Sequence, residues 1–204
     1  TEFDSTGAAF NDLSIDLHAG TTSDDRHKGF DKQVDNFQDQ IMPVILEGIE
    51  GTPHFRELFL RAIRGEKVNI LVTGHSMGGA EAQLLVYDLL EAGIPNECVV
   101  GYTYASAYPI EIQEEDDVEW GGKDDKAIKL DKNILESANI YNIVNPHDPV
   151  PKVGAAITNG QRIGEDIYLD IENIEGDLFA DHNLEKVYRE AVRNREYVDD
   201  KYGR

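Results

Sequence analysis

A serine enclosed by glycines is the feature of this sequence that most directly suggests chemistry. The stretch Gly74-His75-Ser76-Met77-Gly78-Gly79 contains the pattern G-x-S-x-G. A serine hydroxyl held on a sharp turn can attack a carbonyl carbon if a histidine accepts its proton and a carboxylate orients that histidine. We therefore predict that Ser76 is a nucleophile and that the chain also supplies a base and an acid.

The order of residues along the chain narrows the choice of base and acid. In hydrolases with this turn, the acid follows the serine and the histidine comes last. Of the six histidines, His147 and His182 lie after Ser76. Asp148 follows a predicted strand within a proline-rich turn, at the strand end where sites on parallel sheets gather. If Asp148 is the acid, His182 is the histidine left to act as the base.

Other titratable residues offer weaker alternatives. Four aspartates compete with Asp148 but fall in a charged segment rather than after a strand, namely Asp116, Asp117, Asp124 and Asp125. His75 and His147 adjoin the proposed nucleophile and acid, and for both we expect packing or hydrogen bonding in a turn rather than proton transfer.

The elements that must hold these side chains alternate between strands and helices. Aliphatic and β-branched runs predict strands at residues 68–73, 97–104, 138–144 and 166–171. Helical spacing of apolar residues predicts helices at residues 30–45, 53–64, 80–92 and 184–192. The sequence thus predicts an α/β fold with a mostly parallel central sheet and helices on both faces. At the serine turn, strand and helix nearly touch, and we expect the small Gly74, Gly78, Gly79 and Ala80 to permit that approach.

Length and composition limit the remaining choices. We predict one domain over residues 1–204, interrupted by a charged segment at 111–137 that forms a loop or a cap; Trp120 there keeps a substrate-covering role open. A net charge of −21 argues against a nucleic-acid partner, and no apolar run is long enough for a transmembrane segment. The single cysteine, Cys98, excludes an internal disulfide, and we expect no metal and no cofactor. Compartment and oligomeric state are not specified.

Several segments also have counterparts in one known family. Residues 70–80 match its serine turn almost residue for residue, and His27-Lys28-Gly29-Phe30 matches a His-x-Gly-Phe motif upstream. Residues 102–109, 141–151 and 181–188 match the strand after the turn, the acid turn and the histidine segment. Over roughly residues 18–192 the chain resembles the class 3 lipases, the family of fungal triacylglycerol lipases and their bacterial and plant relatives.

This resemblance implies an α/β-hydrolase fold with Ser76 as nucleophile, Asp148 as acid and His182 as base, the same residues that chain order selects. The backbone N–H of Met77 is the expected first oxyanion donor. The family's second donor is a Ser or Thr, whose nearest match here is Thr21, with Thr22 as a competitor.

The sequence also departs from the family pattern. Five residues separate Thr21 from His27, which leaves no room for the lid helix that fungal members carry there. A lid would therefore have to come from elsewhere, such as residues 111–137. Ala105 stands where glycine is usual, which would narrow the pocket.

These observations predict a serine ester hydrolase, a lipase or carboxylesterase that cleaves small-molecule or lipid esters through an acyl-enzyme. One alternative is another acyl hydrolase on the same fold: a phospholipase, a thioesterase or a peptidase. The other is a catalytically silent scaffold used for binding.

Overall fold

A five-stranded sheet forms the centre of the molecule, seen here in a computed structural model that describes residues 26–41, 55–111, 130–152, 160–173, 180–194 and 197–198. The sheet order is β1-β2-β4-β6-β7, comprising β1 (Ile70–His75), β2 (Val99–Tyr104), β4 (Ile140–Val144), β6 (Glu165–Leu169) and β7 (Tyr197–Val198). The first four strands of this order are parallel and β7 is antiparallel. A two-stranded antiparallel sheet joins β3 (Ile110–Glu111) to β5 (Gly160–Gln161).

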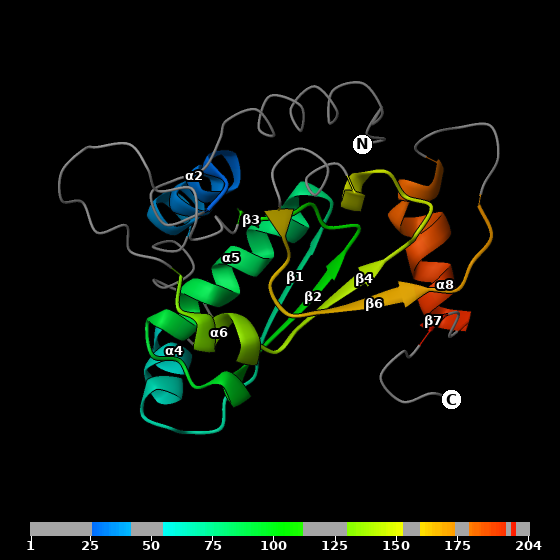
Figure 1. Ribbon diagram of the computed structural model, residues 1–204. Helices are drawn as coiled ribbons and strands as arrows, with labels where there is room; N and C mark the ends of the chain where they lie inside the picture. The colour runs from blue at the N-terminus through cyan, green and yellow to red at the C-terminus, as the bar shows by residue number, and fades with distance from the viewer. Residues whose placement is uncertain are drawn as a thin grey trace, which may run out of the picture.

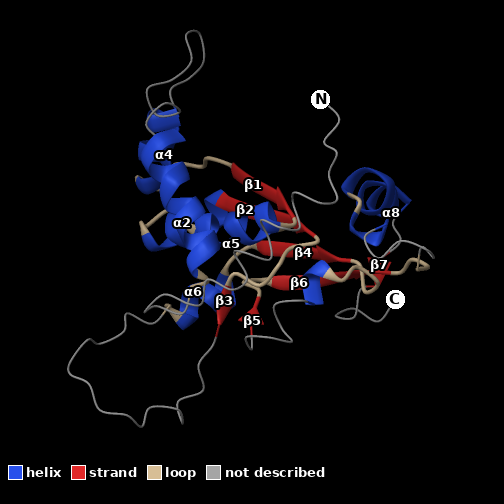
Figure 2. Ribbon diagram, turned by 90° about the horizontal axis from the view of Figure 1, so that it is seen from above, coloured by secondary structure: helices blue, strands red, loops and turns tan. Residues whose placement is uncertain are grey.

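Helices cover both faces of the five-stranded sheet, as predicted (Figure 1, Figure 2). One side carries α2 (Lys28–Asn36), α4 (Phe55–Ile63), α5 (Met77–Glu91) and α6 (Lys132–Ser137). The other carries α8 (Arg189–Asn194), which continues from the π-helical turn η5 (Leu184–Tyr188). Each side has its own apolar core: Phe30, Leu84 and Val86 belong to the first, and Ile143, Leu169 and Val187 to the second.

The predicted elements are present with shifted ends. The strand expected at 68–73 is β1, displaced by two residues, and the helix expected at 80–92 starts earlier, at Met77. Gly93 ends α5 at a φ of +91°, a conformation that glycine adopts without steric cost. The helix expected at 30–45 is α2 followed by the π-helical turn η1 (Phe37–Ile41). Cys98 is a buried free thiol in the short 3₁₀ turn η2 (Asn96–Cys98).

The charged segment at 111–137 is predicted to form a loop or a cap outside the core, and the structure differs from this at the C-terminal end of the segment. Residues 132–137 form α6, and Leu130, Ile134 and Leu135 pack against the core beside α5. Apolar residues spaced along this short helix account for the packing, although acidic and basic residues surround them in sequence. Residues 112–129, including Trp120 and the four competing aspartates, lie outside the described residues, as do Thr21 and Thr22.

Candidate active site

The serine turn joins the carboxyl end of β1 to the first residue of α5. Ser76 sits between the two elements with φ 59° and ψ −125°, a left-handed backbone conformation that costs a non-glycine residue about 1–3 kcal/mol. Two backbone hydrogen bonds hold it there: the Ser76 N–H donates to the Tyr104 carbonyl at 2.9 Å, and its carbonyl accepts from the Gly79 N–H at 3.0 Å. The strand, turn and helix predicted around Ser76 are therefore present.

Two of the four small residues at this turn are sterically required. A Cβ on Gly74 would lie 1.9 Å from the Gly78 carbonyl oxygen, and a Cβ on Gly79 would lie 2.8 Å from the Ser106 Cβ. Ala80 is fully buried. The expectation that Gly78 must be small is wrong, because a Cβ added to Gly78 would meet nothing within 4 Å among the described residues. Gly78 instead contributes the backbone against which Gly74 packs.

The three predicted site residues lie in one chain of hydrogen bonds. His182 Nε2 is 2.8 Å from Ser76 Oγ, and His182 Nδ1 is 2.7 Å from Asp148 Oδ2. The serine follows β1, the aspartate follows β4, and the histidine ends the 3₁₀ turn η4 (Ala180–His182). With Nδ1–H donating to the carboxylate, Nε2 presents a lone pair to the serine hydroxyl. This is the arrangement in which imidazole can remove the hydroxyl proton.

Asp148 is fully buried and accepts hydrogen bonds on both carboxylate oxygens. The Val150 N–H donates to Oδ1 at 2.9 Å, and the Tyr188 hydroxyl donates to Oδ2 at 2.6 Å. Burial, followed by the nearby Asp148 charge, raises the pKa of Tyr188 far above its ordinary value. Tyr188 therefore remains a proton donor, and together with His182 it satisfies a carboxylate that has no access to water.

Asn145 connects the acid turn to the histidine segment. Its side-chain amide donates to the backbone carbonyl and the carboxylate of Asp181, at 3.2 Å each. Its side-chain oxygen accepts from the His147 N–H at 2.9 Å, and its own N–H donates to the Tyr188 hydroxyl at 3.2 Å. This fully buried side chain thus fixes the spacing between the turn that carries Asp148 and the turn that carries His182.

Sequence reasoning assigned no site role to Tyr188 or Asn145. Tyr188 lies within the helix predicted at residues 184–192, at one of the positions whose helical spacing predicts a buried face. The sequence did offer one indication of its role. A tyrosine among aliphatic core positions usually needs a hydrogen-bond partner for its buried hydroxyl. Asn145 lies three residues before Asp148 in the acid turn. His147 is exposed and His75 contacts the histidine segment, which agrees with the turn and packing roles expected for them.

Replacing Tyr188 with phenylalanine should lower the free energy of unfolding by about 2 kcal/mol, because a buried carboxylate loses one donor and the Asn145 N–H loses its acceptor. Urea unfolding measures this change. Tyr168→Phe is the matched control, since that exposed hydroxyl also donates to an aspartate, Asp166, at 3.3 Å. Equal stability changes in the two variants would contradict the role assigned to Tyr188.

The first oxyanion donor expected from the sequence has suitable surroundings. Met77 is the first residue of α5, so its N–H has no acceptor within the helix. The neighbouring Ser76 N–H is already used by the Tyr104 carbonyl. The Met77 N–H therefore lies at the serine turn without an acceptor inside the helix, and its role as an oxyanion donor stays a prediction. Thr21, the expected second donor, lies outside the described residues and stays a prediction.

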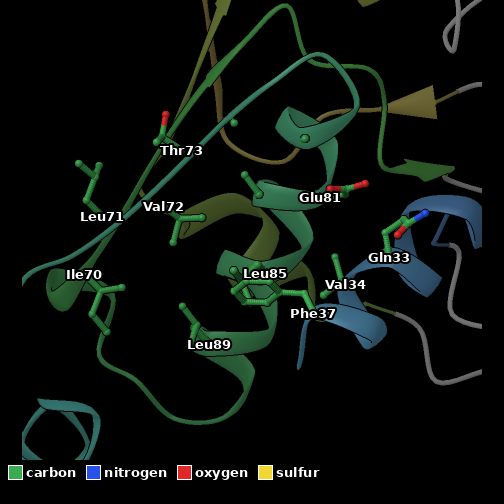
Figure 3. Close-up of a pocket in the computed structure, with 13 residues that line it drawn as sticks. Gln33, Val34, Phe37, Ile70, Leu71, Val72, Thr73, Glu81, Leu85 and Leu89 are labelled. Carbon is green, nitrogen blue, oxygen red and sulfur yellow. The ribbon is translucent and has the colours of Figure 1, made fainter. Parts of the chain in front are cut away.

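An apolar groove of about 500 Å³ runs along β1 where it faces α2 and α5 (Figure 3). Its lining residues include Ile70 and Val72 from β1, Leu85 from α5, Val34 from α2 and Phe37 from η1. The groove reaches Gly74 and Gly78 at the serine turn, but Ser76, His182 and Asp148 do not line it. It therefore adjoins the candidate site without containing these three residues.

The described ranges contain neither a cluster of metal-binding side chains nor a helix suited to crossing a membrane. Within the described ranges, no three His, Cys, Asp or Glu side chains come together in a way that would suit a metal ion. None of the helices in those ranges combines the length and apolar character that crossing a bilayer requires.

Comparison with solved structures finds fungal lipases. Lip2 lipase of Yarrowia lipolytica in its nonglycosylated form is 22% identical, with a TM-score of 0.48, over 78% of this chain and 47% of that chain. A mutant form of MDLA from Penicillium cyclopium is 20% identical, with a TM-score of 0.48, over 77% and 46%. The Rhizomucor miehei lipase propeptide complex is 20% identical, with a TM-score of 0.46, over 71% and 38%. The chain spans less than half the length of these structures.

A match to a family model shows which protein family this chain belongs to. No curated protein sequence matches the chain. The model of the family described as Lipase (class 3) matches residues 10–157, more than two thirds of the chain. Together with the mostly parallel sheet, this match identifies the fold as that of the α/β-hydrolases. The chain belongs to the class 3 lipase family.

Proposed function

We propose that the protein is a serine ester hydrolase of the lipase or carboxylesterase type, acting through Ser76, His182 and Asp148. The observation that carries this proposal is the continuous hydrogen-bond chain from Ser76 Oγ through His182 to Asp148, with Ser76 at a positive φ. Membership of a lipase family supports a lipid or small-molecule ester as the substrate.

In the proposed mechanism, Ser76 Oγ attacks the ester carbonyl carbon while His182 Nε2 takes the hydroxyl proton. Asp148 stabilises the imidazolium that forms, and the Tyr188 hydroxyl continues to donate to the same carboxylate. The carbonyl oxygen becomes an oxyanion, held by the Met77 N–H. We propose Thr21 as its second donor, following the family pattern. Each such donor is worth about 10²–10³ in turnover.

The tetrahedral intermediate then collapses to an acyl-enzyme. The bond to the alcohol oxygen breaks, and the leaving alkoxide takes its proton from His182. A water molecule next attacks the acyl carbon, with His182 again as the base, and the carboxylic acid leaves as Ser76 Oγ recovers its proton. All proton transfers use side chains of this chain, so the cycle needs no cofactor.

Labelling with a fluorophosphonate probe tests this proposal, because the reagent reacts with a serine activated by a neighbouring base. We expect one adduct, located at Ser76 by peptide mass spectrometry, and parallel hydrolysis of p-nitrophenyl esters. Heat-denatured protein is the control and should not be labelled. An unlabelled Ser76 in folded protein would overturn the proposal and favour a silent binding scaffold. A profile of acyl-chain lengths and head groups would separate a lipase from a phospholipase, thioesterase or peptidase.

A further inference from the structure

His75, the residue directly before the nucleophile, contacts the base by a route outside the triad. Its ring Nε2 lies 3.0 Å from the backbone carbonyl oxygen of His182. The two imidazole rings also pack together, with centroids 4.6 Å apart and planes inclined by 35°. The last side chain of β1 thus touches both the main chain and the ring of the residue that must accept the Ser76 proton.

The partner atom determines where the proton on His75 lies. A carbonyl oxygen only accepts hydrogen bonds, so His75 Nε2 must carry a hydrogen and donate it. Burial, followed by the neighbouring His182, lowers the pKa of His75 below its ordinary value. The ring is therefore neutral, with a hydrogen on Nε2 and a lone pair on Nδ1. A neutral His75 places no repelling positive charge beside His182 when the His182 ring becomes an imidazolium.

The segment that carries His182 is the 3₁₀ turn Ala180–His182, and η5 begins two residues later at Leu184. Side chains from two other elements also bind its backbone carbonyls. Asn145 holds the carbonyl of Asp181 from the acid turn, and His75 holds the next carbonyl, that of His182, from the nucleophile strand. Two successive carbonyls of the base segment are thus tied separately to the elements that present the acid and the nucleophile.

We propose that His75 is a positioning residue, which fixes His182 relative to Ser76 by donating Nε2–H to the His182 carbonyl while its ring packs against the imidazole. This inference rests on the proposed function. A displacement of about 1 Å in a catalytic group can cost about 10²-fold in rate. The His182–Ser76 distance of 2.8 Å leaves little tolerance for such movement.

Two substitutions separate the hydrogen bond from the ring. His75→Phe keeps an aromatic ring but has no donor, and His75→Gln keeps an N–H donor that can occupy the position of Nε2. We expect His75→Phe to lower kcat by about 10²-fold with KM unchanged, and to slow fluorophosphonate labelling equally. His75→Gln should stay within about 10-fold of the wild type. His147→Gln, at the exposed neighbour of Asp148, is the matched control and should leave kcat unchanged.

A spectroscopic readout distinguishes positioning from a general loss of stability. The proton between His182 Nδ1 and Asp148 should give a far-downfield imidazole N–H signal in proton NMR spectra. We expect this signal in the wild type and in His75→Gln, and its broadening or loss in His75→Phe at temperatures well below the melting transition. An unchanged signal and wild-type kcat in His75→Phe would overturn the inference, as would equal losses in the two His75 variants. Absence of Ser76 labelling in the wild type would instead overturn the proposed function.

Discussion

Replacing Ser76 with alanine should lower kcat for ester hydrolysis by about 10⁶-fold, because in the proposed mechanism it removes the atom that forms the covalent bond to the acyl group. His182 and Asp148 would remain in place but have no nucleophile to activate. Turnover of p-nitrophenyl esters and fluorophosphonate labelling measure the effect. Ser137→Ala, at an exposed serine near the end of α6, is the control and should leave both readouts unchanged.

A second substitution at the same position tests the backbone strain independently of chemistry. Ser76→Gly should be as inactive as Ser76→Ala but about 1 kcal/mol more stable, because glycine adopts a φ of 59° without the clash of a Cβ. Chemical unfolding of the two variants gives this difference. Retained turnover in Ser76→Ala would refute the nucleophile assignment. Equal stability of the two variants would refute the strain argument alone.

Replacing Gly74 with alanine should destabilise the fold by about 3 kcal/mol or more, a large part of the stability of a domain of ordinary size. The added Cβ would lie 1.9 Å from the Gly78 carbonyl oxygen and 2.4 Å from the Gly78 carbonyl carbon. Both atoms belong to the backbone of α5, so no side chain can rotate to relieve the overlap. The start of the helix would have to move away from β1, which also displaces Ser76. Urea unfolding measures the change.

Gly78→Ala is the control, because it adds the same methyl group on the opposite side of the contact. A Cβ on Gly78 meets nothing within 4 Å among the described residues. Alanine is also favoured over glycine in a helix by about 0.5–1 kcal/mol, so Gly78→Ala should be neutral or stabilising. If Gly74→Ala proves as stable as Gly78→Ala, the close approach of β1 and α5 cannot be the reason for glycine at residue 74.

Much of the fold was predictable from the sequence because the relevant patterns are local. The strand before Ser76 and the helix after it follow from runs of aliphatic residues and from helical spacing, and Gly93 marks the helix end. Segments with mixed signals were predicted less well. The helix α6 was not predicted because its few apolar residues stand among charged ones. Their packing against the core is evident only in the structure. The two-residue strand β7 is similarly too short to carry a periodic pattern.

The site divides in the same way. The chain order and the serine turn selected Ser76, Asp148 and His182, because hydrolases with this turn place their acid and base in a fixed order after the nucleophile. No sequence pattern indicates that Tyr188 donates to a carboxylate 40 residues earlier, or that His75 binds a carbonyl 107 residues later. These contacts form near the carboxyl ends of the parallel strands, on the face of the sheet where η5 and α8 pack. The types of reacting residues are thus encoded locally, whereas their supporting partners follow from strand order and helix packing, which no short stretch of sequence specifies.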